Sequence, residues 1–259
     1  MTTNQQHEAY AAVQAARSTA KIQIQTLIDD LIADFFPLHG DRAGGDDPAV
    51  IGGIGQLADL PITVVGIQKG RTTQENIERH FGSALPEGYR KSLRLMKEAA
   101  KFHRPVLALI NTPGAFPDKH SEDFGQGEAI ARCLLEGMQL PTPILSVIVG
   151  EAGSGGALAL ACGDDIWMFE HSTYSILSPE GYASIMWKDA TRAPEAAVKL
   201  GLTPKELLAE HIVDRVITEV TNAAQAKDLA TALHARFTAL MALPTAELLA
   251  RRQARYRKF

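Results

Sequence analysis

The sequence has few cysteines and no long apolar run, and both absences narrow what the chain can be. Its two cysteines, Cys133 and Cys162, lie among apolar neighbours without the spacing of metal ligands, which is typical of reduced core residues in a cytosolic protein. No apolar run approaches the ~20 residues of a membrane span, and the opening residues, MTTNQQ, lack the pattern of a signal peptide. The sequence therefore predicts a cytoplasmic protein without a membrane-spanning segment.

A strong excess of charge of either sign is also absent. The formal net charge is −4, so general affinity for nucleic acid or for an anionic membrane is not expected. The 259 residues are 46% hydrophobic, which is enough to bury a large core. Because no linker, repeat or low-complexity tract interrupts them, we expect a single domain over residues 1–259.

The N-terminal part predicts one amphipathic helix over about residues 4–36. Its apolar residues recur at helical spacing, whereas Asp29, Asp30 and Asp34 face away from them. The apolar stripe consists of Ile24, Leu27, Ile28, Leu31, Ile32 and Phe35. Pro37 is expected to end this helix.

The rest of the chain predicts an α/β fold with a mostly parallel sheet. After a loop rich in glycine and aspartate, the β-rich runs 49–57 and 61–68 predict a hairpin. Beyond residue 70, strands and helices alternate. Further strands are expected at 106–110, 143–149, 166–169, 174–177 and 212–217, and helices from Pro86, from Ser121, over 157–162 and over about 222–258.

The most informative segment is the glycine-rich run from Gly150 to Leu160, GEAGSGGALAL. It follows the β-branched strand expected at 143–149 and leads into a short apolar helix that Gly163 ends. A strand, a glycine turn and a helix start leave unpaired backbone N–H groups aimed at one spot, with the positive end of the helix dipole behind them. Such a spot binds an anion or stabilises one that forms in a reaction, so we predict an oxyanion hole.

Other glycine motifs compete for this segment. A dinucleotide-binding fingerprint needs a third glycine where Leu158 stands, and a P-loop needs a lysine where Gly156 stands. A serine-hydrolase elbow stays open because Ser154 lies in an approximate Gly-x-Ser-x-Gly pattern. A purely structural role of the glycines in helix–sheet packing also stays open. Candidate partners for a triad with Ser154 are Asp164, Asp165, His171, Asp189 and His211.

A second glycine-bearing loop, 111–117, follows the strand expected at 106–110. Active sites of open α/β sheets gather at the carboxyl ends of strands, so both loops are expected to line one crevice. An ordinary turn explains the second loop equally well. No side chain near Gly155 is an obvious general base, and this absence is itself informative about the site.

Basic residues gather in two further places. Lys69 and Arg71 precede Arg90, Lys91 and Arg94, a set that could bind phosphates or carboxylates but is more typical of a solvated helix face. The same holds for a basic cluster at the C-terminus, for which contact with a partner is the alternative. That cluster consists of Arg251, Arg252, Arg255, Arg257 and Lys258.

Taken together, these motifs resemble the carboxyltransferase alpha subunits of bacterial acetyl-CoA carboxylases. The resemblance runs from about Gly40 to about Ile217 over many colinear blocks, which is more specific than any single glycine loop. The blocks are GDR (40–42), GIQKGR (66–71), PEGYRK (86–91), TPGA (112–115), EAIAR (128–132), GSGGALA (153–159), STYS (172–175) and the segment 178–188.

The resemblance implies a crotonase-like (ClpP/crotonase) α/β fold, a spiral of β-β-α units with flanking N- and C-terminal helices. It also implies that the carboxyl group of carboxybiotin, attached to a separate carrier protein, is transferred to acetyl-CoA. The product is malonyl-CoA, in the first committed step of fatty-acid biosynthesis. Biotin and the acetyl thioester each become an oxyanion, and biotin itself is thought to act as the base.

Residue roles follow from the resemblance as well. Gly155 and Gly156 would be the catalytic residues, because their amides would form the oxyanion hole on the carboxybiotin side. Substrate-binding roles would fall to Gly114, Ala115, Gly153, Ala157, Lys69 and Arg71.

The resemblance further implies partners. A carboxyltransferase subunit beta, which carries a four-cysteine zinc site in a zinc ribbon, would supply the thioester side of the site. A biotin carboxyl carrier protein and a biotin carboxylase complete the set, and the two carboxyltransferase chains would form an α2β2 heterotetramer. This chain itself is expected to bind no metal. A non-catalytic scaffold for subunit beta is the alternative, although every glycine of the predicted hole is present.

Overall fold

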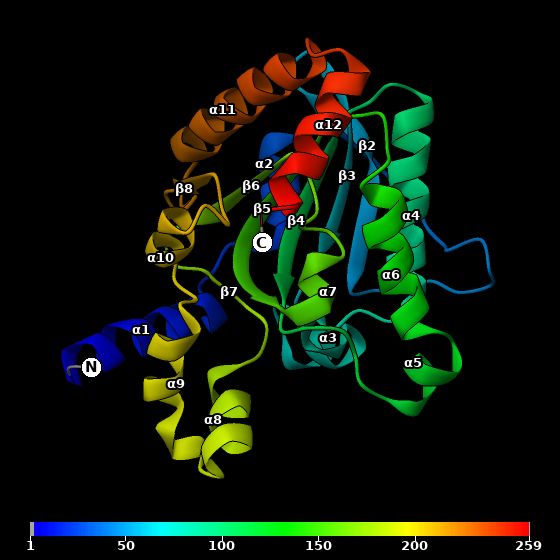
Figure 1. Ribbon diagram of the computed structural model, residues 1–259. Coiled ribbons are helices and arrows are strands. Elements are labelled where there is room, and N and C mark those ends of the chain that lie inside the picture. The colour runs from blue at the N-terminus through cyan, green and yellow to red at the C-terminus, as the bar shows by residue number, and fades with distance from the viewer. Residues whose placement is uncertain (1–2, 259) are drawn as a thin grey trace.

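The computed structural model describes residues 3–258, and the strands within them form one eight-stranded sheet (Figure 1). The order is β1-β2-β3-β4-β5-β6-β8, with β7 paired to the end of β5. The pairs β1–β2 and β2–β3 are antiparallel, and every later pair is parallel. The strands are β1 (Ala33–Pro37), β2 (Val50–Leu57), β3 (Leu60–Ile67), β4 (Val106–Thr112), β5 (Ile144–Gly153), β6 (Asp165–Phe169), β7 (Thr173–Ser175) and β8 (Arg215–Ile217).

Helices cover both faces of this sheet, so the central strand β4 is buried along its whole length. On β4, Ala108 and Ile110 belong to the core that packs under α4 (Pro86–Lys101) and α6 (Gln126–Gly137). Leu107 and Leu109 alternate with them and belong to the opposite core. That second core packs under α2 (Ile24–Leu31) and α11 (Ala223–Met241). The predicted β2–β3 hairpin, the helix from Pro86 and the parallel strands are confirmed.

Further helices flank these layers, several of them at the end of the sheet where β4 and β5 finish. No helix of residues 3–258 has the length and apolar character needed to cross a membrane. The remaining helices are α1 (Thr3–Arg17), α3 (Thr73–Glu78), α5 (Lys119–Asp123), α7 (Ser154–Leu158), α8 (Pro179–Trp187), α9 (Ala193–Leu200), α10 (Pro204–Ala209), α12 (Thr245–Tyr256) and two 3₁₀ turns, His80–Gly82 and Ala190–Arg192.

The prediction of one N-terminal helix over about 4–36 is wrong. The chain forms α1 and α2 with a break between them, and then enters the edge strand β1. Ile32 and Phe35 continue the apolar spacing of α2, but they pack against glycine positions of β2: a Cβ at Gly55 would run into Ile32, and one at Gly53 would run into Phe35. When apolar residues of a helix are followed by apolar residues of a strand, their combined spacing can look like that of one longer helix.

The prediction of a solvated basic C-terminus is also wrong for two arginines. Arg252 is 1% exposed, and its guanidinium donates to both carboxylate oxygens of Asp164 at 2.8 and 2.7 Å and to the carbonyl oxygen of Leu140 at 2.9 Å. Arg255 is buried as well and pairs with Asp214 at 2.5 Å. These contacts attach α12 to the loops that precede β5 and β6 and to the loop that follows α10.

Candidate active site

The parallel strands β3, β4 and β5 all end at one edge of the sheet, so the segments that follow them meet there. Figure 1 shows α3, α5 and α7 gathered at this edge. The glycine-rich end of β5 leads directly into α7, which begins at Ser154. The predicted order of strand and helix is present, but no separate turn lies between them: β5 runs through Gly153 and α7 starts at Ser154, earlier than the helix expected at 157–162.

The two glycine loops touch each other. A Cβ on Gly156 would lie 2.5 Å from the backbone N of Ala115 and 2.7 Å from the backbone C of Gly114. One on Gly153 would run into the carbonyl group of Pro113. Gly114 has φ 140°, a conformation that favours glycine. Lack of space therefore requires glycine at 153 and 156, whereas Gly114 has room for a Cβ and is favoured as glycine by its φ alone.

The loop after β4 is held in shape by one side chain. The hydroxyl of Thr112 accepts a hydrogen bond from the amide of Gly114 at 3.1 Å and donates one to the carbonyl oxygen of Gly114 at 3.0 Å. Thr112 is fully buried, so this small turn presents the Ala115 amide to the α7 side in a fixed position.

Backbone amides are the candidate hydrogen-bond donors at this junction. The first amides of a helix have no acceptor within it, and Gly155 and Gly156 occupy the first turn of α7. Outside helices and strands, the amides of Gly155, Gly156 and Ala115 donate none of the backbone hydrogen bonds among residues 3–258. Unpaired N–H groups that converge on one place can hold an anion.

An apolar cavity of about 580 Å³ opens beside Gly155. Its described lining contains no aspartate, glutamate or histidine, and Lys199 is its one charged side chain. Burial raises the pKa of Tyr174 in its wall, so this phenol keeps its proton. The cavity can therefore exclude water and strengthen electrostatic interactions, but its walls offer no carboxylate or imidazole as a general base. The other lining residues include Leu158, Ile166, Ile176, Tyr182, Leu207, Ile212 and Tyr256.

Ser154 has the strained backbone of a nucleophile elbow, with φ 51°, but no triad forms around it. The five candidate partners are engaged or placed elsewhere. Asp164 binds Arg252, Asp165 binds Arg236, Asp189 caps the turn at Thr191, His171 lies 3.6 Å from Glu219, and His211 does not line the cavity. The geometry therefore disfavours the serine-hydrolase alternative.

The structure separates the predicted site residues into three groups. The first group forms the junction of the two loops and consists of Gly114, Ala115, Gly153 and Gly156; Gly155 lies between this junction and the cavity. Ala157 is completely buried in the core beneath α4 and α6.

Lys69 and Arg71 form the third group, because their side chains are engaged elsewhere. Lys69 pairs with Glu151, and Arg71 bonds the hydroxyl of Thr26 in α2. Lys91, expected on a solvated face, is 2% exposed and pairs with Asp46 at 2.6 Å.

Glu151, within the glycine-rich run, is a residue that the sequence reasoning missed. Besides Lys69 it binds Nε of Arg17, the last residue of α1, at 2.5 Å. Arg17 also reaches Glu180 in α8 at 2.8 Å. Burial alone would raise the pKa of Glu151, but the neighbouring cations of Lys69 and Arg17 outweigh it and hold the pKa below its usual range. The sequence did contain one sign of these ion pairs, namely a charged residue at the end of an otherwise apolar strand.

This network predicts a pH-dependent stability. A carboxyl group whose pKa is lowered by folding stabilises the protein above its unfolded pKa, here 4.5, and loses that contribution as pH falls through the lower folded value. We expect Glu151→Gln to lower the free energy of unfolding at pH 7 by about 1–3 kcal/mol, less than for a fully buried pair because Arg17 is partly exposed.

Denaturant unfolding at several pH values measures this effect. The difference from wild type should shrink as pH falls below 4.5. Glu210→Gln, on an exposed glutamate after α10, is the matched control and should change little. A pH-independent deficit in Glu151→Gln would contradict the assignment of the lowered pKa.

Solved structures with this fold are carboxyltransferases and related enzymes. The chain superposes on a structure of transcarboxylase 12S with a TM-score of 0.69 at 17% identity, covering 89% of this chain and 45% of that one. It superposes on a chain of a Pseudomonas malonate decarboxylase hetero-tetramer with a TM-score of 0.67 at 16% identity, covering 83% of this chain and 90% of that one. The crotonase-like fold implied by the sequence resemblance is confirmed.

Sequence relatives define the family more narrowly. Residues 2–259 match the family described as acetyl co-enzyme A carboxylase carboxyltransferase-like. The acetyl-coenzyme A carboxylase carboxyl transferase subunit alpha of Streptococcus pneumoniae (strain Hungary19A-6) is 51% identical over 249 residues, which is 95% of this chain and 98% of the relative. The protein of the same name from strain G54 is 50% identical over the same length. The chain belongs to this family.

Proposed function

We propose that this chain is the alpha subunit of an acetyl-CoA carboxylase carboxyltransferase. It takes part in transferring the carboxyl group from biotin on a carrier protein to acetyl-CoA, which gives malonyl-CoA and commits carbon to fatty-acid biosynthesis. Beyond family membership, one observation carries the proposal. Two glycine loops meet so closely that Gly153 and Gly156 admit no side chain, and Gly155 next to them lines an apolar cavity that presents no acid or imidazole base.

The role of this junction is to stabilise negative charge. Carboxybiotin supplies the carboxyl group when its carrier docks. The amides of Gly155 and Gly156, with that of Ala115 opposite, would hold an oxyanion that develops at the reacting end. Leu158 and Tyr174 provide apolar walls for a ring system. Fixed donors in a dry site need no reorganisation during the reaction, and each is typically worth about 10²–10³ in rate.

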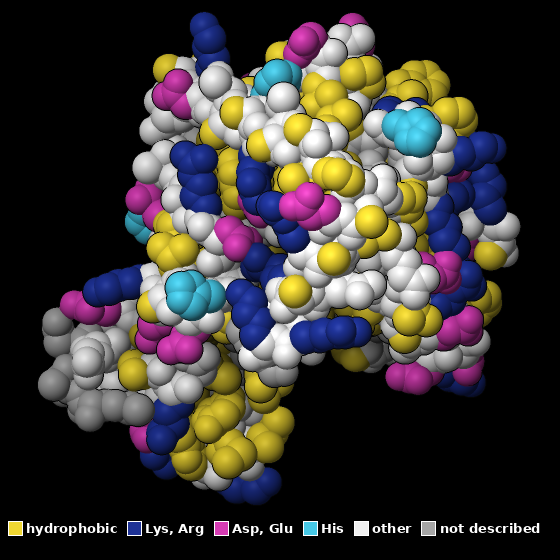
Figure 2. Space-filling model, turned by 45° about the horizontal axis from the view of Figure 1, so that its top comes forward, with side chains coloured by type: hydrophobic (Ala, Val, Ile, Leu, Met, Phe, Trp, Pro, Cys, Tyr) yellow, Lys and Arg dark blue, Asp and Glu magenta, His cyan; other side chains and the backbone are white. Residues whose placement is uncertain are grey.

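The other half of the site must come from a partner, for which the surface offers a place. Ile176, in the cavity wall, is 77% exposed, and Ile185 and Met186 on α8 are 60% and 59% exposed. Figure 2 shows apolar side chains gathered on the lower lobe of the molecule, where α8 lies in Figure 1. Exposed apolar groups that gather in this way mark a protein interface.

We assign this surface to the zinc-ribbon beta subunit, in an α2β2 assembly served by the biotin carboxyl carrier protein and biotin carboxylase. The coverage of transcarboxylase 12S supports this assignment, because the present fold accounts for only 45% of that longer chain. Among residues 3–258, no three histidine, cysteine, aspartate or glutamate side chains gather as metal ligands. That the beta chain carries a zinc site is part of what the family resemblance implies.

The function is tested by reconstitution. The chain is mixed with a beta subunit of the same family, a carboxylated biotin carrier and acetyl-CoA, and the products are identified by mass spectrometry. The proposal requires malonyl-CoA in amounts that follow the carboxylated carrier consumed. An assembled complex that consumes neither reactant would refute it.

A substitution at Ser154 separates this proposal from hydrolysis. Ser154→Ala and Ser154→Gly should both keep most of the carboxyltransferase activity, because the proposed chemistry uses backbone amides and not the hydroxyl. Glycine also suits the positive φ of this position. The rates of malonyl-CoA formation by the two variant complexes give the answer. Inactive but folded variants, together with labelling of Ser154 by an active-site serine probe, would revive the hydrolase.

A further inference from the structure

One hydroxyl group next to the junction has no hydrogen-bond partner. Tyr89, in the first half of α4, is 0% exposed, and its Oη lacks any partner among the described residues. Buried polar groups are nearly always paired, because an unpaired one bears the whole cost of losing water. A phenylalanine would fill the same space without that cost, so the hydroxyl calls for an explanation.

The position of this hydroxyl suggests one. The point where a Cβ of Gly156 would lie is 2.7 Å from Tyr89 Oη and 2.5 Å from the backbone N of Ala115. The phenol therefore stands directly behind the place where the two glycine loops meet. Three N–H or O–H groups therefore lie close together here, on Ala115, Gly156 and Tyr89, and of these the hydroxyl of Tyr89 has no acceptor among the described residues.

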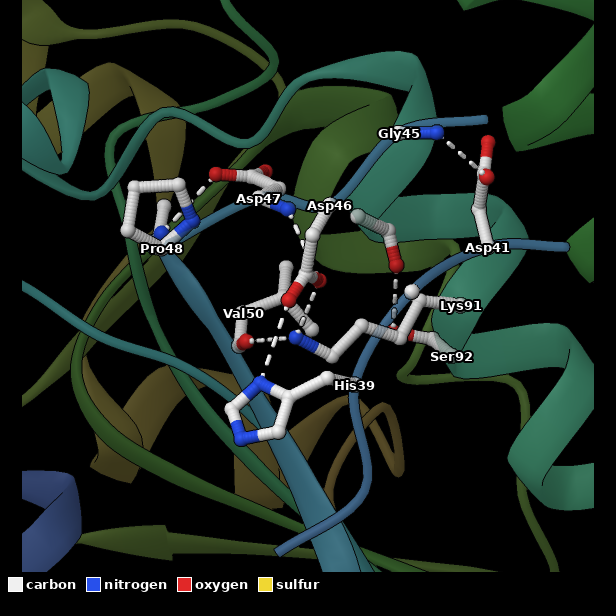
Figure 3. Close-up of polar contacts among 12 residues, drawn as sticks. His39, Asp41, Gly45, Asp46, Asp47, Pro48, Val50, Lys91 and Ser92 are labelled. Carbon is white, nitrogen blue, oxygen red and sulfur yellow. Dashed lines mark hydrogen bonds and ion pairs between the residues drawn. The ribbon is translucent and has the colours of Figure 1, made fainter. Parts of the chain in front are cut away.

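The helix that carries Tyr89 is fixed firmly at its beginning. The buried carboxylate of Asp47 accepts hydrogen bonds from the amides of Leu85 and Ala49, both at 2.8 Å. One turn further on, Lys91 Nζ donates to Asp46 at 2.6 Å and to the carbonyl oxygen of Val50 at 2.8 Å (Figure 3). The loop before β2 thus anchors the turn of α4 on which Tyr89 lies, and the phenol has little freedom to move.

The protonation state of this phenol is also fixed. Burial raises the pKa of Tyr89, and the neighbouring Cys133 and Asp47 add to the effect. The hydroxyl therefore keeps its proton throughout the working range of the enzyme. It remains an O–H dipole and never becomes a negative charge.

We propose that Tyr89 is a positioning residue of the carboxyl-transfer site. Its ring sets the spacing of the Gly156 and Ala115 amides, and its O–H dipole supports those amides as charge develops on the reactant. Tyr89 does not touch the reactant, because no solvent-accessible surface reaches its hydroxyl. A fixed dipole in a poorly solvated place acts strongly on a charge nearby. This inference rests on the proposed function and extends it by one residue.

The test is Tyr89→Phe in the reconstituted complex, which removes the dipole and keeps the ring. We expect kcat to fall about tenfold, less than for loss of a donor that touches the oxyanion, with KM for both substrates unchanged. The unfolding midpoint of the chain should stay equal or rise. Tyr10→Phe is the matched stability control: its hydroxyl donates to Oε1 of Glu180 at 3.0 Å, away from the cavity, so its loss should lower the midpoint.

A purely structural phenol predicts a different pattern. If Tyr89→Phe leaves kcat unchanged, or changes only KM, the inference is overturned. The proposed function is still upheld in that case, provided that the wild-type complex forms malonyl-CoA. A wild-type complex that forms no malonyl-CoA would overturn the proposed function, and this inference with it.

Discussion

Replacing Gly156 with alanine should lower kcat for carboxyl transfer by about 10²–10³, roughly 3–4 kcal/mol of transition-state stabilisation. The new Cβ would lie 2.5 Å from the Ala115 backbone N and 2.7 Å from the Gly114 backbone C. Backbone atoms cannot swing away as a flexible side chain can, so the two loops must separate. The amides then no longer point at one place. Gly156→Val, with a branched side chain, should abolish activity.

The matched control is Gly127→Ala. Gly127 lies in α6, and a Cβ there would meet nothing within 4 Å. An alanine in a helix is more favourable than glycine by roughly 1 kcal/mol, so this variant should be active and slightly more stable. Steady-state kinetics give kcat for the Gly156→Ala and Gly127→Ala complexes, each with its subunit composition verified. A folded Gly156→Ala complex with wild-type kcat would remove the junction from the mechanism.

The isolated chain is expected to be inactive. It offers one group of converging amides, whereas transfer to a thioester develops charge on two reactants. The cavity beside Gly155 is bounded on this chain by the strongly exposed Ile176, so a second reactant has no wall to hold it. Losing the alignment of two reactants is worth about 7–11 kcal/mol of barrier. Malonyl-CoA decarboxylation assayed with each subunit alone should therefore stay at background.

Much of the fold follows from local patterns. The β2–β3 hairpin, the apolar face of α4 and the parallel strands β4 and β5 were all predictable, because their side chains alternate or recur with the period of the element. The meeting of the two glycine loops was also predictable, since neighbouring parallel strands end at one edge. The boundary between α2 and β1 was not predictable. Ile32 and Phe35 have the sequence spacing of a helix, but in the structure they pack against β2.

The features that sequence reasoning missed are contacts between distant segments. Arg17 lies 134 positions from Glu151, and Arg252 lies 88 positions from Asp164. Arginine and lysine are usually exposed, and nothing local marks a basic residue whose partner stands on another element. Tyr89 lies on the apolar face of α4, and its ring is buried in the core there. Only the neighbouring loops reveal that its hydroxyl ends behind Gly156.

The central claim is that this chain provides half of a shared carboxyltransferase site, and a titration tests it most directly. A fixed amount of the chain is mixed with increasing beta subunit, and the initial rate of malonyl-CoA formation is measured at saturating carboxylated carrier and acetyl-CoA. The account predicts no turnover without beta, a rise with added beta and a plateau at equimolar chains. Turnover by this chain alone that matched the plateau rate would contradict it.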